Sequence, residues 1–309
     1  MLRDKQVERH ISQRRRKRYN YWAYLWVLPV VVLIAIFSAY PLINSFVLSF
    51  TNSSGSGYGD FIGFQNFIEL FQDEVFWICM KNVLIFTIVG IVCGNFMTIT
   101  LAELLFSVKF KKTSAVMRIL FILPVLVPTV VILLVWENII FSSNGFINQI
   151  YLALGKDPIA WYFENPYNMI AIIMTNFPWV GGTSFLIYLA GLQNINKSVF
   201  EAARLDGISG MRRVVRIDLP LIKGQLKYFL IMGVIGGLQN FDLQLIITGS
   251  GPGTTNGVNV PGYYIFQLAW SGEYDVRYGY ASAIGVIIFL ITIGFSIANF
   301  RKNKREIAK

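Results

Sequence analysis

Long apolar runs separated by short polar segments dominate the pattern of this chain. A charged side chain at the depth of a bilayer costs several kcal/mol, so charge-free stretches of about 20 residues locate candidate membrane-spanning helices. Six such stretches occur, with apolar parts at Trp22–Leu48, Asn82–Ala102, Ile119–Trp136, Met169–Leu192, Tyr228–Thr248 and Tyr278–Phe300. The pattern therefore predicts an all-α polytopic membrane protein with six transmembrane helices.

Two of these stretches carry an interruption. Pro124 and Pro128 stand in the third, and a proline removes a helix hydrogen bond and bends the helix. Asp242 interrupts the fifth between Phe241 and Leu243. We expect a bend in the third helix and a polar break in the fifth.

Charged residues are few and unevenly placed. They make up 14% of the 309 residues, against about 25% in a soluble domain, which argues against a lone soluble enzyme. The basic segments are the N-terminal stretch, the connections between spans two and three and between spans four and five, and the C-terminal tail; together they hold 24 of the 27 Lys and Arg. Cytoplasmic segments of membrane proteins are enriched in these residues, so both termini are predicted to be cytoplasmic. The net charge of +10 then reflects sidedness, and no nucleic-acid partner is indicated.

The predicted organisation is a basic cytoplasmic tail (1–21), a transmembrane domain (22–300) with a cytoplasmic loop (196–224), and a second tail (301–309). The single histidine, His10, and the two cysteines, Cys79 and Cys93, leave no catalytic triad and no metal-ligand spacing. No catalytic residue and no metal site are therefore predicted.

The fourth connection is the most informative segment. It runs EAARLDGISGMRRVVRIDLPLIKG from Glu201 to Gly224. Its first residues favour helix, Gly207 permits a turn, and Ser209 is placed to cap a second short helix. Pro220 ends that helix or starts the next. Physical reasoning alone gives a helix–turn–helix on the cytoplasmic face, either an interfacial amphipathic element or a docking surface for a soluble partner.

This spacing resembles the cytoplasmic EAA motif of ABC-importer permeases, and the resemblance extends over nearly the whole chain. It implies the type I ABC-importer permease (MetI-like) fold, in which this loop forms coupling helices that enter a cleft on a cytoplasmic ATPase subunit. The coupling residues implied here are Glu201, Ala202, Ala203, Asp206, Gly207, Ile217, Leu219 and Pro220.

Flanking segments resemble the carbohydrate-uptake (maltose-type) branch of this family. They include Tyr40-Pro41, Gly63 to Phe67, Ala190 to Gln193 and Gly279 to Ala283. The resemblance implies import of a sugar or oligosaccharide across a bacterial or archaeal plasma (inner) membrane. It also implies a heterodimer with a second permease, two ATPase subunits and an extracellular substrate-binding protein. This chain would hold no cofactor, because the partner ATPases bind Mg-ATP.

Polar residues inside the spans are candidates for a substrate path. They are Asn176, Trp179, Gln239, Asn240 and Asp242. Charges within a membrane seldom face lipid, so Asp242 either lines the path or serves as a structural partner at a wet helix end. Trp179 could stack on a sugar or belong to the interfacial aromatic belt.

Two alternatives stay open at this stage. The same class of permease imports polyamines, phosphate or peptides, and Asp242 would suit a cationic cargo. A stand-alone secondary transporter or an integral membrane enzyme is the other alternative, although such transporters usually show internal repeats and ion-coupling charges within the membrane.

Overall fold

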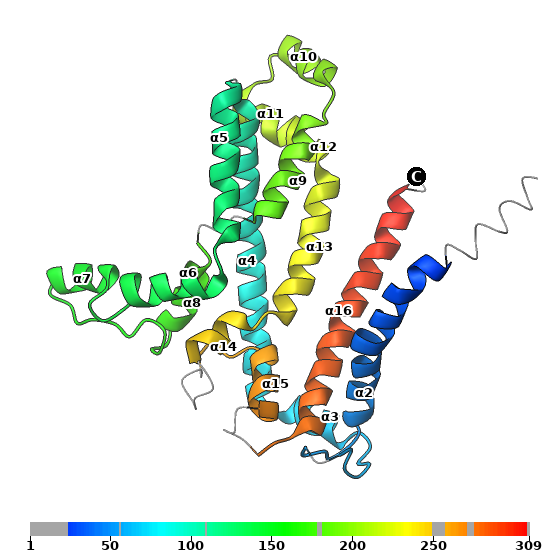
Figure 1. Ribbon diagram of the computed structural model, residues 1–309. Coiled ribbons are helices and arrows are strands. Elements are labelled where there is room, and N and C mark those ends of the chain that lie inside the picture. Colours follow the sequence, from blue (N-terminus) through cyan, green and yellow to red (C-terminus); the bar gives the residue numbers. More distant parts are fainter. Residues whose placement is uncertain are drawn as a thin grey trace, which may run out of the picture.

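The computed structural model describes residues 24–55, 57–108, 110–177, 181–248, 257–270 and 275–307. Within these ranges every regular element is a helix, apart from the isolated bridges Thr51–Phe61 and Gly55–Gly57. Long helices run side by side, and shorter ones cap both ends and extend to one side (Figure 1). The predicted all-helical fold class is confirmed for these residues.

Four helices are long and apolar enough to cross a membrane. They correspond to the predicted first, second, fifth and sixth spans. The first is Tyr24–Leu48, which ends in α2 (Tyr40–Leu48), and the second is α4 (Glu74–Ser107). The fifth, Lys223–Ile247, combines α13 (Lys223–Gln239) with most of α14 (Asp242–Thr248), and the sixth is the apolar part, up to Asn299, of α16 (Tyr278–Ile307). Asp73 caps α4, since its carboxylate accepts a hydrogen bond from the Val75 amide at 2.8 Å. In the first helix a widened turn, η1 (Ala35–Ala39), comes just before Pro41, whose missing N–H disturbs the regular ladder.

The third predicted span is sharply bent. It consists of α5 (Lys111–Ile122), η2 (Leu123–Leu126), α6 (Thr129–Val135) and η3 (Trp136–Ile140), and the two halves meet at 89°. Pro124 lies in η2 and Pro128 precedes α6, so the prolines stand at the break as expected. The bend is a right angle rather than a kink within one straight span.

The fourth predicted span is divided. α8 (Tyr167–Thr175) and α9 (Gly182–Gln193) take its two halves, and neither is long enough to cross a bilayer alone. Short elements fill the connections: α3 (Gln65–Gln72), α7 (Phe146–Ala153), α10 (Lys197–Leu205), α11 (Gly210–Arg213), η4 (Val214–Asp218), α12 (Leu219–Leu221) and α15 (Pro261–Trp270).

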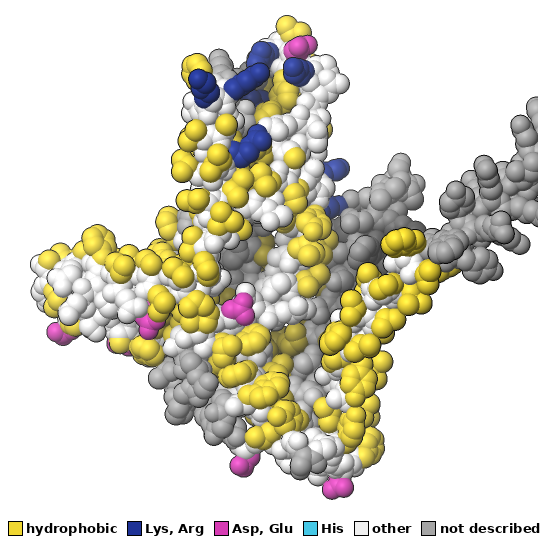
Figure 2. Space-filling view, in the orientation of Figure 1, with side chains coloured by type: hydrophobic (Ala, Val, Ile, Leu, Met, Phe, Trp, Pro, Cys, Tyr) yellow, Lys and Arg dark blue, Asp and Glu magenta, His cyan; other side chains and the backbone are white. Residues whose placement is uncertain are grey.

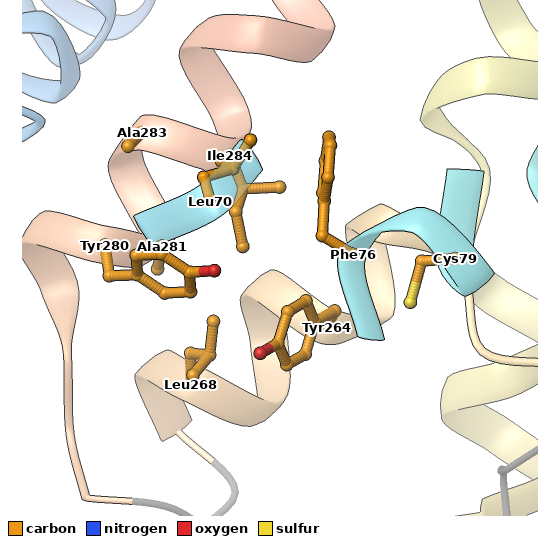
Figure 3. Packing of buried hydrophobic residues seen from close by; sticks show 9 residues of the cluster. All are labelled: Leu70, Phe76, Cys79, Tyr264, Leu268, Tyr280, Ala281, Ala283 and Ile284. Carbon is orange, nitrogen blue, oxygen red and sulfur yellow. The ribbon is translucent and has the colours of Figure 1, made fainter. Parts of the chain in front are cut away.

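The packed core is split into clusters where helices meet. One cluster joins α3 and the start of α4 to α15 and α16, as Figure 3 shows for Leu70, Phe76, Tyr264, Tyr280 and their neighbours. Hydrogen bonds also stabilise this contact between helices, because the Asp73 carboxylate accepts from the hydroxyls of Tyr264 (2.9 Å) and Tyr280 (2.6 Å). The segment between the first two spans is thus held against the last span.

The surface separates apolar side chains from charged ones. Large apolar residues are exposed along the first helix, such as Trp26 (81% exposed) and Phe37 (73%). Figure 2 shows Lys and Arg gathered over α5, α10 and α11 at one end, while most Asp and Glu on that face lie toward the other end. A bilayer is the solvent that suits such an apolar middle with polar ends.

Candidate functional site

The loop with the EAA spacing projects from the helix bundle. In Figure 1 α10 lies beyond the ends of α4 and α5, and α11 and α12 lead from it back to α13. α10 begins at the cap residue Asn196, whose side chain accepts a hydrogen bond from the Ser198 amide at 3.1 Å. Ala203 faces inward and is only 4% exposed, whereas Glu201, Ala202 and Asp206 are exposed. Of the predicted coupling residues in this segment, Glu201, Ala202 and Asp206 are therefore exposed, whereas Ala203 is not.

Gly207 ends α10 as the sequence predicts. Its φ is +71°, a conformation that side chains with a Cβ resist. The Ile208 amide donates to the Ala203 carbonyl at 2.8 Å, and the Gly207 amide donates to the Arg204 carbonyl at 3.1 Å. This is the Schellman arrangement, which satisfies the last carbonyls of the helix and reverses the chain.

The second half of the loop returns to the bundle. Ser209 occupies the N-cap position of α11 with extended dihedrals, as predicted. Its hydroxyl, however, makes no capping hydrogen bond within the described residues. Pro220 stands in the first turn of α12, one of its two predicted places. Ile217 is half-buried, and Leu219 packs on a core cluster of α4 and α9.

The outer surface of the loop also presents large apolar side chains. Leu205 is 90% exposed, Met211 is 75% exposed and Val215 is 57% exposed. Leu205 directly precedes Asp206 in the sequence and follows Glu201 by one helical turn, and both carboxylates are exposed. Apolar side chains next to charges in a polar segment form a surface that suits a protein partner.

Arg213 joins the loop to the end of α4. Its guanidinium lies 2.8 Å from the Asp218 carboxylate and 3.6 Å from that of Glu103. The same group lies over the rings of Phe106 (5.6 Å) and Phe200 (5.5 Å). The sequence analysis did not identify this cluster, because Glu103 and Arg213 are far apart in the chain and only folding brings them together.

A cavity of about 650 Å³ opens between α4, α8, α9, α13 and α14. Its size is within the ordinary range for small-molecule sites, about 300–1,000 Å³. Both apolar and neutral polar side chains line it. The structure thus supplies a site between the helices, away from the loop.

Three predicted substrate-path residues meet at this cavity: Asn176 at the end of α8, Asn240 at the break after α13, and Asp242 at the start of α14. Gln239 lies elsewhere, in a separate cavity of about 310 Å³ between α13, α15 and α16. Trp179 lies outside the described residues.

The break beside Asp242 follows from local backbone chemistry. Asn240 is extended, with ψ of 132°, and its side-chain oxygen accepts a hydrogen bond from the Asp242 amide at 3.2 Å. Asp242 is therefore the first residue of α14, where a negative charge is stabilised by the helix dipole. The fifth predicted span breaks at Asn240, two residues before the predicted interruption at Asp242.

The sequence analysis missed the polar lining that α4 contributes. Thr87, Asn95 and Thr98 all face the cavity, and Asn95 accepts a hydrogen bond from the Tyr188 hydroxyl at 2.6 Å. These neutral residues lie within a charge-free apolar run, so a search for charges passes over them. Their spacing, with Ile91 and Gly94 between them, puts all of them on one face of the helix. That periodicity is the sequence feature from which this polar face of α4 could have been predicted.

Comparison with known proteins identifies the family. Residues 87–305 match the family described as "Binding-protein-dependent transport system inner membrane component". The chain belongs to this family. It is a multi-pass membrane protein and a transport permease subunit.

Individual relatives align over almost the entire permease. The probable ABC transporter permease protein YurN of Bacillus subtilis is 30% identical over 92% of this chain and 97% of its own length. The lactose transport system permease protein LacF of Rhizobium radiobacter is also 30% identical, over 92% of this chain and 95% of its own. The trehalose/maltose transport system permease protein MalF of Thermococcus litoralis is 27% identical over 94% of this chain and 96% of its own length.

A solved structure shares the fold. A chain of a bacterial alginate ABC transporter, crystallised in complex with a periplasmic protein carrying an alginate pentasaccharide, superposes with a TM-score of 0.78. The sequences are 24% identical, and the match covers 93% of this permease and 96% of that chain. The predicted type I ABC-importer permease fold is confirmed in its architecture.

Proposed function

We propose that this permease forms half of the membrane path of an ATP-driven, binding-protein-dependent importer for a sugar or oligosaccharide. The observation that carries the proposal is the EAA spacing, in a loop that exposes Glu201, Ala202 and Asp206 and turns through a Schellman arrangement at Gly207. Relatives named for lactose, trehalose/maltose and arabinooligosaccharides support a sugar cargo, since each aligns with at least nine-tenths of this chain.

The topology we propose has six crossings and both termini in the cytoplasm. The bent pair α5–α6 and the divided pair α8–α9 would then supply the third and fourth crossings, in addition to the four long helices. The gathering of Lys and Arg over the end with α5, α10 and α11 supports a cytoplasmic location for that end. The proposed location is a bacterial or archaeal inner membrane.

The loop is the proposed docking surface for the ATPase. Glu201, Ala202 and Asp206 would contact the partner directly, and the exposed Leu205 and Met211 would be buried against it. Ala203, Gly207, Ile217, Leu219 and Pro220 would instead set the shape of the loop and its attachment to the bundle. Two ATPase subunits would bind and hydrolyse Mg-ATP, and this chain itself would hold no cofactor.

The cavity is the proposed translocation path. The amides of Asn176 and Asn240 and the carboxylate of Asp242 offer donors and acceptors for sugar hydroxyls. A second permease of similar design would complete the path as a heterodimer, and an extracellular binding protein would deliver the cargo. Gln239 faces a different cavity, so its variants should affect transport less than those of Asn240.

Docking is tested with the double variant Glu201→Lys, Gly207→Pro. The first change reverses an exposed charge, and the second removes the left-handed turn because proline fixes φ near −65°. We expect the variant complex to lose its ATPase on purification and to lose substrate-stimulated ATP hydrolysis. Glu164→Lys, an exposed glutamate outside the loop, is the matched control and should retain both. Intact assembly and hydrolysis in the double variant would show that the loop does not dock the ATPase.

A cationic cargo is the second candidate, favoured by the Asp242 carboxylate at the cavity. The cognate binding protein decides between the two, because it selects the cargo before this chain meets it. Calorimetric titration with a polyamine and with a panel of oligosaccharides should give binding by a sugar only. Micromolar binding of the polyamine would replace the sugar assignment.

A further inference from the structure

The Arg213 cluster connects the loop to the end of the transmembrane helix α4. Arg213 belongs to α11, Asp218 follows it on η4, and Glu103 belongs to the last turns of α4. Asp218 is fully buried and Glu103 is 8% exposed. The rings of Phe200 of α10 and Phe106 of α4 lie 5.7 Å apart at an interplanar angle of 45°, and both contact the same guanidinium. Three segments of the loop and one transmembrane helix thus meet at one side chain.

The charge balance makes this connection hard to break. Two buried carboxylates share one guanidinium, and within the described residues both Glu103 oxygens and Asp218 Oδ1 lack a hydrogen-bond donor. Removing the guanidinium would leave two unpaired charges in a buried place, which is strongly unfavourable. Loop and helix are therefore expected to move together rather than separate at Arg213.

α4 carries such a movement to the cavity. Thr98, which lines the cavity, lies five residues before Glu103, or about 7.5 Å along the helix axis. Asn95, Ile91 and Thr87 continue the lining along the same helix. A displacement of the loop that shifts the end of α4 would therefore change the wall of the cavity.

We propose that Arg213 is the joint that transmits movement of the loop to α4 and so opens and closes the cavity. Arg213 is a positioning residue, since it acts through Glu103 and touches neither the cavity nor the outer face of α10. This inference rests on the proposed function, because it needs an ATPase that moves the loop. It assigns transmission to the buried side of the loop, separate from docking on the exposed side.

The test replaces the whole cluster so that no buried charge is left alone. Arg213→Met by itself should be strongly destabilising, whereas the neutral triple variant Glu103→Gln, Arg213→Met, Asp218→Asn preserves approximate side-chain volume and removes the ion pairs. Arg216→Met is the matched control, because Arg216 is an exposed arginine three residues further along the same segment. Each complex is reconstituted in vesicles, and retained ATPase, ATP hydrolysis and sugar uptake are measured together.

We expect the triple variant to keep its ATPase and to hydrolyse ATP while uptake per ATP falls by about tenfold, the size of an ordinary coupling between two sites. The Arg216 control should keep the normal ratio. A normal ratio in the triple variant would overturn the proposal. Loss of the ATPase in the triple variant would also overturn it, because the cluster would then shape the docking surface. Failure of the unmodified complex to hold an ATPase would instead refute the proposed function.

Discussion

At the scale of single residues, Gly207 decides how the loop with the EAA spacing turns. An added Cβ would meet nothing within 4 Å, so any penalty of a substitution comes from the backbone alone. The left-handed conformation at φ of +71° costs an ordinary L-residue about 1–2 kcal/mol. Asparagine tolerates this conformation better than alanine, so Gly207→Asn should disturb the turn less than Gly207→Ala.

We therefore predict that Gly207→Ala loosens the turn without unfolding the bundle. Hydrogen exchange at the Ile208 amide, which donates to Ala203, should accelerate about 5- to 30-fold, the factor that one or two kcal/mol produces. Gly207→Asn should accelerate it less. Equal exchange in all three proteins would mean that the turn does not depend on glycine.

The sequence reveals some of the individual site residues and hides others. Glu201, Gly207 and Pro220 stand at a fixed spacing within one loop, so their places in a helix, a turn and a helix start follow from local chemistry. Glu103 and Arg213 carry no such signal, since their pairing depends on how α4 packs against the loop. Local patterns can predict local geometry, but contacts between distant segments require the fold.

At the scale of elements, close contact between α4 and α13 forms one wall of the cavity. Gly233 and Gly237 lie four residues apart on α13, a spacing of small residues that lets membrane helices approach closely. A Cβ on Gly237 would lie 2.5 Å from Thr87 Oγ1 of α4, whereas a Cβ on the adjacent Gly236 would meet nothing. A side chain at position 237 would therefore clash with α4, whereas position 236 has room for one.

We predict that Gly237→Ala destabilises the permease by about 1–3 kcal/mol through overpacking. Gly236→Ala should be neutral or slightly stabilising, because alanine favours helix more than glycine does. Thermal unfolding of the purified permease in detergent measures both, and the Gly237 variant should unfold several degrees lower. Equal unfolding temperatures would place the helices further apart than described.

The hydrophobic pattern predicts six spans; four of them are long helices in the structure, but the pattern does not give the shape of the predicted third and fourth spans. It measures how many apolar residues follow one another, and that count is similar for a straight span and for α5–α6, which turns by 89°. Pro124 and Pro128 marked the break without giving its angle. The division between α8 and α9 had a weaker signal still, because the stretch from Met169 to Leu192 is free of charge.

At the scale of the whole molecule, the isolated chain presents surfaces that suit partners. A cavity opens between α4, α8, α9, α13 and α14, and the first helix exposes apolar side chains along its length. The loop with the EAA spacing exposes Leu205 and Met211 at the basic end. Such surfaces suit the proposed assembly, in which lipid and a second permease would surround the chain and an ATPase would bind the loop.

The most direct test of this account is ATP-driven uptake by the complete assembly in vesicles. This permease, its partner permease and the ATPase subunits are reconstituted with ATP inside, and the binding protein is added outside with a panel of labelled oligosaccharides. The account predicts uptake of a sugar that requires both ATP and the binding protein and stops when the ATPase is omitted. Uptake by this chain alone, driven by an ion gradient, would contradict it.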